Sequence, residues 1–178
     1  MLDKPTPTEL IDGSAPMSSD ELLVMLENQG ITHKTVDHAP MWTVEDAKSL
    51  REPCDYGHTK NLFVRNKKGE MWLLCLHEDR LVDLKAAARR AGTNRFSFAS
   101  SARMMQYLGV TPGAVSAFSI LNDVTHQVRF LMDESLMAHP ALHIHPLINT
   151  RTTTISRQAL LDFLGRRGHP FGILHFEE

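Results

Sequence analysis

The segment from Lys60 to His77 constrains the fold more than any other part of the chain. It is typical of two strands, 60–66 and 70–77, joined by a tight turn at Lys67-Lys68-Gly69. The second strand is apolar throughout, which indicates neighbours on both sides and cover on both faces. The segment therefore predicts a β-sheet with this second strand at its centre.

The first strand of this hairpin carries a cation and an amide at its start. Leu62 and Val64 alternate with their neighbours, so we expect one face of the strand to enter a core. Lys60 and Asn61 would then stay at the mouth of that core. A lysine here is normally a solvated strand end unless other segments bring polar groups to it. Two later segments are able to do so: the Gly-rich turn 111–117 and the step His145-Pro146.

Helix and strand signals are mixed along the chain. Helix starts are indicated by capping residues at Ser18-Ser19-Asp20-Glu21, Thr43-Val44-Glu45-Asp46, Asp83, Ser100 or Ser101, and Ser156. Further strands are expected at 32–37, 126–132, 142–145, 152–156 and 171–176. Regular strand–helix alternation and Gly-rich nucleotide motifs are absent from the sequence. We expect an α+β (mixed α/β) fold with a central mixed or antiparallel, barrel-like sheet and peripheral helices.

Length and composition suit one compact domain, because the chain has 178 residues and is 42% hydrophobic. We expect a polar leader at 1–17 and a single domain at 18–178. No apolar run approaches the roughly 18 residues of a membrane helix. The leader lacks the apolar core of a signal peptide, so a cytoplasmic location and no membrane partner are expected.

The charge is distributed unevenly. The net charge of −2 argues against a protein that grips DNA or other long nucleic acids with its whole surface. Residues 60–103 nevertheless hold 10 basic and 4 acidic side chains, whereas 1–59 hold 4 basic and 11 acidic ones. This positive segment is either a solvated hairpin and helix face or a footprint for a few phosphates, which suits an RNA end.

Metal and thiol chemistry have little support in the sequence. His143 and His145 are two residues apart on an expected strand, a spacing that metal sites sometimes use, but no third ligand stands at a telling offset. Cys54 and Cys75 form no CxxC pair, and we interpret them as a loop thiol and a core thiol. We therefore expect no metal and no cofactor.

Four short motifs occur in an order that points to a family. They are Lys60-Asn61-Leu62-Phe63, Gly113-Ala114-Val115-Ser116, Asn122-Asp123, and His145-Pro146 followed by Asn149-Thr150. In motif order and spacing, from 18 to 176, the chain resembles the YbaK/prolyl-tRNA synthetase-associated editing-domain family. The resemblance is strongest to the freestanding alanyl-tRNA(Pro) deacylase branch, because Asn61 after Lys60 favours alanine-specific over cysteine-specific members.

The resemblance implies hydrolysis of a mischarged aminoacyl ester on the terminal adenosine of tRNA, with the substrate's 2′-hydroxyl assisting the water. It implies that Lys60, Asn61 and His145 are catalytic. The substrate-binding residues it implies are Gly113, Ala114, Val115, Ser116, Ala117 and Asn122. Backbone donors of the loop would face the carbonyl oxygen. The implied partners are the acceptor end of mischarged tRNA(Pro) and, further, prolyl-tRNA synthetase.

One residue departs from the family pattern. The loop usually ends in proline, as Gly-x-x-x-Pro, whereas this chain has Ala117. Proline would fix φ near the bound aminoacyl group, so the departure bears on pocket shape and substrate choice.

Two other functions stay open. The first is a module of the same fold that binds a tRNA end, or another RNA end, without turnover. The second is a metal-dependent hydrolase that uses His143 and His145. Turnover separates the first from a deacylase, and sensitivity to a chelator separates the second.

Overall fold

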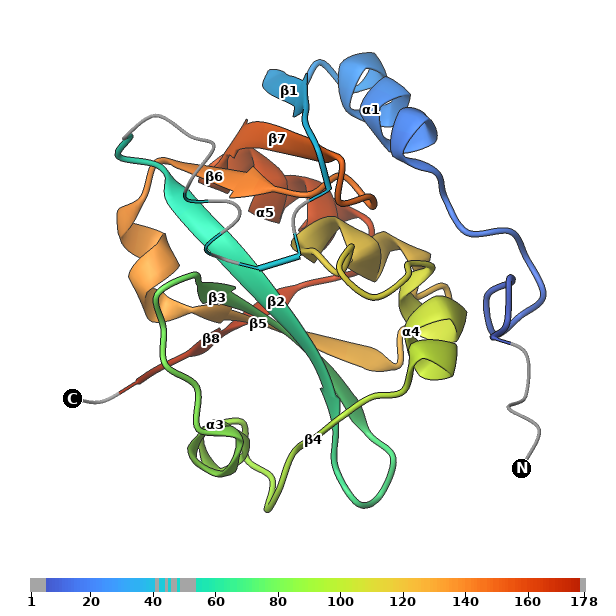
Figure 1. Cartoon of the computed structure of the whole chain (residues 1–178), viewed down its shortest axis with the longest axis vertical. Helices are drawn as coiled ribbons and strands as arrows, with labels where there is room; N and C mark the ends of the chain where they lie inside the picture. The colour runs from blue at the N-terminus through green and yellow to red at the C-terminus, as the bar shows by residue number, and fades with distance from the viewer. Residues whose placement is uncertain (1–5, 41, 44, 46–47, 49–53, 177–178) are drawn as a thin grey trace.

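Strand β3 (Met71–His77) lies inside one eight-stranded sheet, between β2 (Gly57–Arg65) and β5 (Val128–Asp133) (Figure 1). The computed structural model describes residues 6–40, 42–43, 45, 48 and 54–176. Six of the seven β3 residues are buried, as their apolar character requires. The predicted hairpin and the central position of its second strand are both confirmed.

The sheet contains parallel and antiparallel pairs. Of the two predicted arrangements, mixed or antiparallel, it therefore has the mixed one. Its other strands are β1 (His33–Asp37), β4 (Ser97–Phe98), β6 (Ala141–Ile144), β7 (Arg151–Ser156) and β8 (Phe171–Leu174). The order is β1-β7-β6-β2-β3-β5-β8, with β4 paired to β2. The pairs β2–β6, β3–β5 and β5–β8 are parallel, and the other pairs are antiparallel. Among the described strands, the path begins at β1 and ends at β8.

Helices surround the sheet, and local capping chemistry sets where they begin. They are α1 (Ser19–Asn28), α3 (Leu84–Arg90), α4 (Ser101–Leu108), α5 (Arg157–Arg166), and the 3-10 helices η1 (Ala117–Asn122) and η2 (Glu134–Ala138). Ser18 and Glu21 form the predicted capping box, and Asp83, Ser100 and Ser156 cap as expected. Of the helix start expected at 43–46, residues 44 and 46 lie outside the described residues. No described helix is long and apolar enough to cross a membrane.

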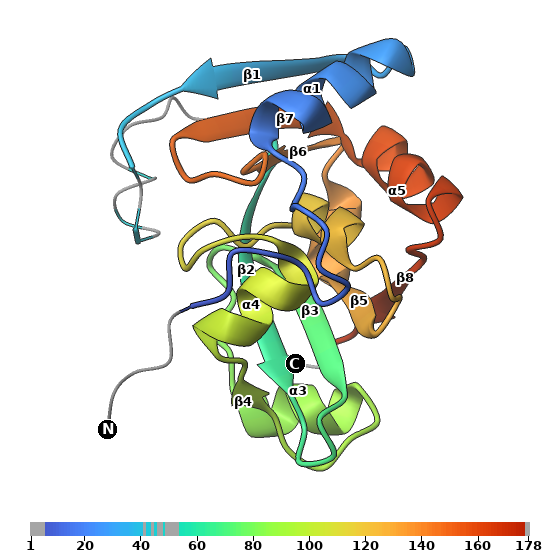
Figure 2. The same cartoon turned by 90° about the vertical axis from the view of Figure 1, so that its right-hand side faces the viewer.

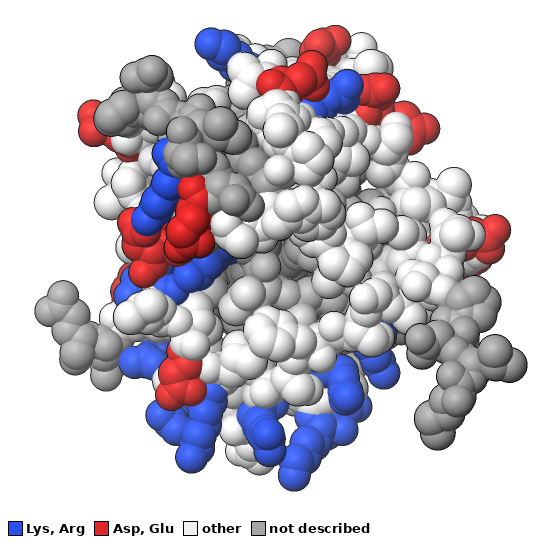
Figure 3. All heavy atoms as spheres, viewed as in Figure 1, with Lys and Arg blue, Asp and Glu red and all other residues white. Residues whose placement is uncertain are grey.

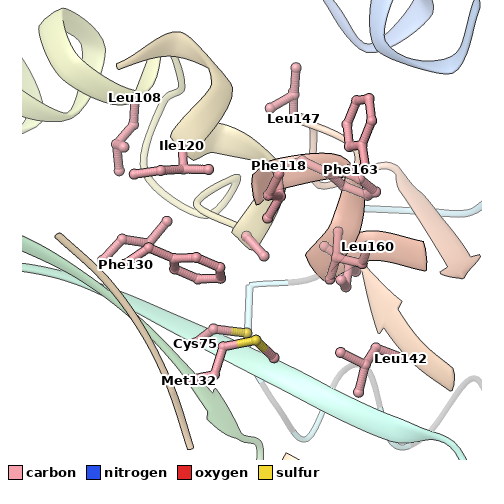
Figure 4. Close-up of a cluster of buried hydrophobic side chains, with 14 of the residues drawn as sticks. Cys75, Leu108, Phe118, Ile120, Phe130, Met132, Leu142, Leu147, Leu160 and Phe163 are labelled. Carbon is pink, nitrogen blue, oxygen red and sulfur yellow. The ribbon is translucent and has the colours of Figure 1, made fainter. Parts of the chain in front are cut away.

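The core consists of two hydrophobic clusters on opposite faces of β2. Phe63 belongs to the larger cluster with Phe118 and Phe163, part of which Figure 4 shows. Val64 belongs to the smaller cluster with Trp72. The expectation that the face with Leu62 and Val64 enters a core is therefore confirmed, and the opposite face, with Phe63, is covered as well.

The N-terminal elements attach to the sheet through β7. α1 lies beside β1 and β7 at one end of the molecule (Figure 2), and its Leu22 and Leu26 are fully buried. The Arg151 guanidinium joins these elements, because it pairs with Asp20 of α1 and with Asp37 of β1. The described part of the leader also packs, since Leu10 is buried and the N–H of Ile11 donates to the Gln106 carbonyl at 2.8 Å.

Gly109 ends α4 in the left-handed region, with φ of 63°, and has no space for a side chain. An added Cβ would lie 2.5 Å from Asn122 Nδ2 and 2.6 Å from Pro16 Cβ. Gly92 has a similar φ of 77° but open space around it. Alanine substitutions at these two glycines therefore separate two contributions to the free energy of unfolding, one from backbone conformation and one from crowding.

We expect Gly109→Ala to lower the free energy of unfolding by about 2–4 kcal/mol, because strain and overpacking add. Gly92→Ala should lower it by about 1 kcal/mol, from strain alone. Urea unfolding of both variants measures the difference. Equal losses would contradict close packing between α4, Asn122 and the leader.

Candidate active site

Lys60 is half-buried on β2, and a loop after β3 holds its ammonium group. Its Nζ donates to the backbone carbonyl of Arg80. Burial lowers the Lys60 pKa, while the charges of Asp79, Asp133 and Glu78 oppose that shift. The side chain is thus a cation placed by a specific contact rather than a freely solvated strand end.

Arg80 is itself held by a buried carboxylate that the sequence analysis did not identify. Its Nε and Nη2 donate to Oδ2 and Oδ1 of Asp133, both at 2.8 Å. Asp133 is fully buried and also accepts from the N–H of His77 and from Ser135. Burial alone would raise the Asp133 pKa, but these hydrogen bonds outweigh it and the pKa is lowered. This ion pair therefore fixes the carbonyl that orients Lys60.

Asn61 points to the opposite face of β2 from Lys60, because neighbouring strand residues alternate. It shares that face with Phe63, which lies in the larger cluster. Its Oδ1 is buried and has no hydrogen-bond partner among the described residues. An unpaired buried acceptor costs stability, and almost none of this oxygen is accessible to solvent, so a donor from outside the chain reaches it only when neighbouring side chains move.

The loop 113–117 meets the turn that follows His145. Gly113 has φ of 91°, and a Cβ there would lie 3.4 Å from Asn149 Nδ2 and 2.9 Å from Cζ3 of Trp42. Trp42 is 68% exposed, so the far side of its indole faces solvent. Asn149 Nδ2 is buried without a hydrogen-bond partner among the described residues. No sequence pattern singles out Trp42, and Asn149 follows the His145-Pro146 motif without a predicted role.

The loop also offers hydrogen-bonding groups. Within the described part of the chain, the N–H groups of Gly113 and Val115 make no hydrogen bond. The N–H of Ala114 donates to the Thr111 carbonyl at 3.1 Å, which closes the turn. Ser116 is fully buried, and its Oγ has no partner among the described residues. Two backbone N–H groups and one hydroxyl without a partner among the described residues therefore lie within four residues of the loop.

Ala117 keeps the backbone path that the missing proline would favour. It is the first residue of η1, where proline is well tolerated, and Ser116 before it is extended at φ −150° and ψ 170°. Asn122 has structural contacts instead, since it accepts from the N–H of Met17 and donates to the Leu108 carbonyl. Substrate binding by Asn122 stays a prediction.

His145 follows β6 and is held in one tautomer. Its Nδ1 lies 2.8 Å from the carbonyl oxygen of Arg151, so Nδ1 carries the hydrogen and Nε2 keeps its lone pair. Burial lowers the His145 pKa, and nearby His38 lowers it further. The result is a neutral imidazole whose Nε2 has no hydrogen-bond partner among the described residues.

His143 does not pair with His145 in the way that the metal alternative supposed. Its Nε2 lies 3.4 Å from the sulfur of Cys54, and its ring stacks on His58 with centroids 4.5 Å apart. Cys54 is exposed and Cys75 is buried, which confirms their interpretation as a loop thiol and a core thiol.

Positive charge gathers at one end of the molecule. Figure 3 shows Lys and Arg side chains there, at the end that carries the β2–β3 turn, α3 and β4. Arg65 is five residues from Lys60 along β2, which corresponds to about 17 Å of strand. The candidate site and the positive surface therefore lie along one strand.

Comparison with known proteins identifies the family. A family model described as an aminoacyl-tRNA editing domain matches residues 38–163, which is more than half of the chain and includes every candidate site residue. The chain belongs to the aminoacyl-tRNA editing domain family. This editing-domain protein is therefore an enzyme, an aminoacyl-tRNA deacylase that hydrolyses an ester.

Relatives of this editing-domain protein are named for prolyl-tRNA. Prolyl-tRNA editing protein ProX of Acetoanaerobium sticklandii is 33% identical over 152 residues, which are 84% of this chain and 92% of the relative. Prolyl-tRNA synthetase associated domain-containing protein 1 of Xenopus laevis is 29% identical over 162 residues, with 88% and 96% covered.

A solved structure shares the fold. It is described as a candidate trans-editing enzyme for prolyl-tRNA synthetase and aligns with a TM-score of 0.66 at 18% identity, covering 92% of this chain and all of its own. At this identity the likeness confirms the α+β fold alone.

We expect Asp133→Asn to lower the free energy of unfolding by about 3 kcal/mol at neutral pH, because it leaves Arg80 without its buried partner. The folded-state pKa of Asp133 lies below the usual 3.8, so the carboxylate stabilises the fold above that pH and loses its effect below it. The gap between wild type and variant should therefore shrink in acid. Asp37→Asn, in an exposed pair, is the control and should change little.

We expect His145 to contribute to acid sensitivity. Because its folded-state pKa lies below the usual 6.5, the unfolded chain takes up a proton first, and stability falls as the pH drops below about 6.5. His145→Asn retains an N–H donor for the Arg151 carbonyl and has no titrating group. Its Tm should fall less than that of wild type between neutral pH and pH about 5. Equal slopes would contradict a buried neutral imidazole.

Proposed function

We propose that this deacylase hydrolyses alanyl-tRNA(Pro) in trans, without using a metal ion in the reaction. Three kinds of observation support the proposal: the names of the relatives, the family resemblance of the Lys60-Asn61 step, and the polar groups of the candidate site. The last of these carries most weight, because it concerns this chain's own atoms.

Three buried side-chain polar atoms have no hydrogen-bond partner among the described residues: Asn61 Oδ1, Ser116 Oγ and Asn149 Nδ2. Each comes from one of the three segments that the sequence analysis expected to meet. Leaving such an atom unpaired costs about 1–3 kcal/mol, so a fold keeps three of them only where something else supplies partners. A bound substrate supplies both donors and acceptors.

The chemistry of these atoms suits an aminoacyl ester. Asn61 Oδ1 is an acceptor for the substrate's ammonium group, and Asn149 Nδ2 is a donor for a carbonyl or ribose oxygen. The N–H groups of Gly113 and Val115 are donors for the oxyanion that forms when water attacks the ester. The Nε2 lone pair of His145 can accept a hydrogen from the terminal ribose or from water.

The reaction makes modest demands on the protein, because an aminoacyl ester is already activated. The site has to hold the ester, place water and stabilise one developing charge. The substrate's own 2′-hydroxyl assists the water in this proposal, so no protein base is needed. Lys60 acts as a cation for the terminal phosphate or for the developing charge.

Alanine is the substrate that needs such an enzyme. A synthetase pocket built for proline rejects the smaller alanine weakly, since the lost apolar contact is worth about 1–3 kcal/mol. A second site that admits alanine and excludes the proline ring corrects the error. The side chains of Ala114, Ser116 and Ala117 along the loop are small, which suits recognition of a methyl group rather than a proline ring.

The expected partner is the acceptor end of tRNA(Pro). The positive end of the molecule lies along β2 from Lys60, so an acceptor stem that starts at the site can reach it. The negative net charge of the whole chain implies weak intrinsic affinity, and prolyl-tRNA synthetase would supply the tRNA.

The test compares hydrolysis of alanyl-tRNA(Pro) and prolyl-tRNA(Pro) with chelator present. We expect rapid loss of alanine only. Asn61→Ala should lower the rate by about 100-fold or more, because it removes a group that contacts the reacting ester. Lys60→Ala should lower it as much, because it removes the cation for the terminal phosphate on the other face of β2. Lys34→Ala, an exposed lysine on β1, is the matched control and should keep the wild-type rate.

Three results would contradict the proposal. Hydrolysis of both esters at similar rates would remove the selectivity for alanine. Binding of tRNA without turnover of either ester would favour the recognition module, and loss of activity in chelator would favour the metal-dependent hydrolase.

A further inference from the structure

Cys54, His58 and His143 converge at the point where β2 and β6 pair. Gly57 and His58 of β2 are in parallel register with Leu142 and His143 of β6 (Figure 1). Cys54 lies on the approach to β2, so its thiol is brought to both histidines. The sulfur is 3.5 Å from Nε2 of His58 and 3.4 Å from Nε2 of His143.

These distances match the edges of a metal coordination shell. In a tetrahedral zinc site, with Zn–S of about 2.3 Å and Zn–N of about 2.05 Å, sulfur and nitrogen ligands are about 3.6 Å apart. All three candidate ligand atoms lie within 4.8 Å of one another. The two imidazole rings stack nearly parallel, at an interplanar angle of 13°, so one ring has to turn before a single ion can lie in the plane of both and contact all three atoms.

The tautomer of His143 is also suited to a ligand. Its Nδ1 lies 2.9 Å from Oγ1 of Thr154, the residue opposite it on β7. When Nδ1–H donates to that hydroxyl, the Nε2 lone pair faces the sulfur. Metal-binding histidines are usually oriented by such a second hydrogen bond.

We propose that Cys54, His58 and His143 bind a divalent transition-metal ion of the zinc type. One thiolate and two imidazoles are soft and borderline ligands, which select such ions over Mg²⁺ and Ca²⁺. Cys54 is exposed, so the fourth ligand position is open to water. The ion would link the segment before β2 to β6. It would lie near Lys60 and His145 but take no part in the proposed reaction.

A hydrogen-bonded thiol explains the cluster less well. A neutral thiol has one hydrogen and can donate it to only one of the two Nε2 atoms. A metal ion uses the lone pairs of all three atoms at once. A thiolate nucleophile paired with an imidazolium is the competing chemistry, and its reactivity distinguishes it.

The test titrates the full chain, stripped by chelator, with Co²⁺ as a spectroscopic probe and then with Zn²⁺. We expect one Co²⁺ to bind, with a thiolate-to-cobalt charge-transfer band that Zn²⁺ displaces. Cys54→Ser should abolish the band, and His143→Ala should weaken binding by about tenfold or more. Cys75→Ala and His175→Ala are the matched controls and should bind as wild type.

A second measurement needs no variant. Zn²⁺ should protect Cys54 of the unmodified chain from alkylation by iodoacetamide, as judged by peptide mass. Absence of saturable Co²⁺ binding, an unchanged band in Cys54→Ser, or fast alkylation that Zn²⁺ does not slow would each overturn the proposal. Deacylation by the metal-free protein is a separate readout, so failure of the metal site and failure of the proposed function are distinguishable.

Discussion

The pairing of β2 determines where a substrate site can form in this fold. Along one edge, β2 pairs with β3 from Thr59 to Arg65. Along the other edge it pairs with β6 only at Gly57 and His58, and with β4 only at Val64 and Arg65. Among the described residues the stretch between has no strand partner on that edge, and it contains Lys60 and Asn61. An interior strand with an interrupted edge offers a rigid support and open access in the same place.

The candidate site is stabilised from elsewhere in the fold. Its unpaired polar atoms lower stability, and two hydrophobic clusters on the faces of β2 offset this cost. The Arg80–Asp133 pair adds a rigid contact behind Lys60. Because a buried ion pair contributes little net stability by itself, we infer that the main effect of this pair is to position the Arg80 carbonyl and, through it, Lys60.

Local patterns in the sequence predict local structure well in this chain. The capping box at Ser18 and the apolar run of β3 each depend on residues that are neighbours in sequence. Both can therefore be predicted from the sequence without knowledge of the fold. Contacts between residues far apart in the sequence cannot be predicted in this way. The pairing of Cys54 with His143 depends on the parallel register of β2 and β6, and that of Arg80 with Asp133 on the approach of a loop to β5. The roles of Lys60, Asn61 and His145 were drawn from a family resemblance, and they stay predictions.

Arg151 connects the edge of the molecule to the candidate site. Its guanidinium contacts α1 and β1, while its carbonyl accepts the Nδ1 hydrogen of His145. Among the described strands β1 pairs only with β7, so this N-terminal unit is expected to open at a lower free energy than the whole domain. Each such opening frees the arginine and loosens the carbonyl that orients the imidazole. Opening of this peripheral helix and strand is therefore expected to loosen the alignment of His145.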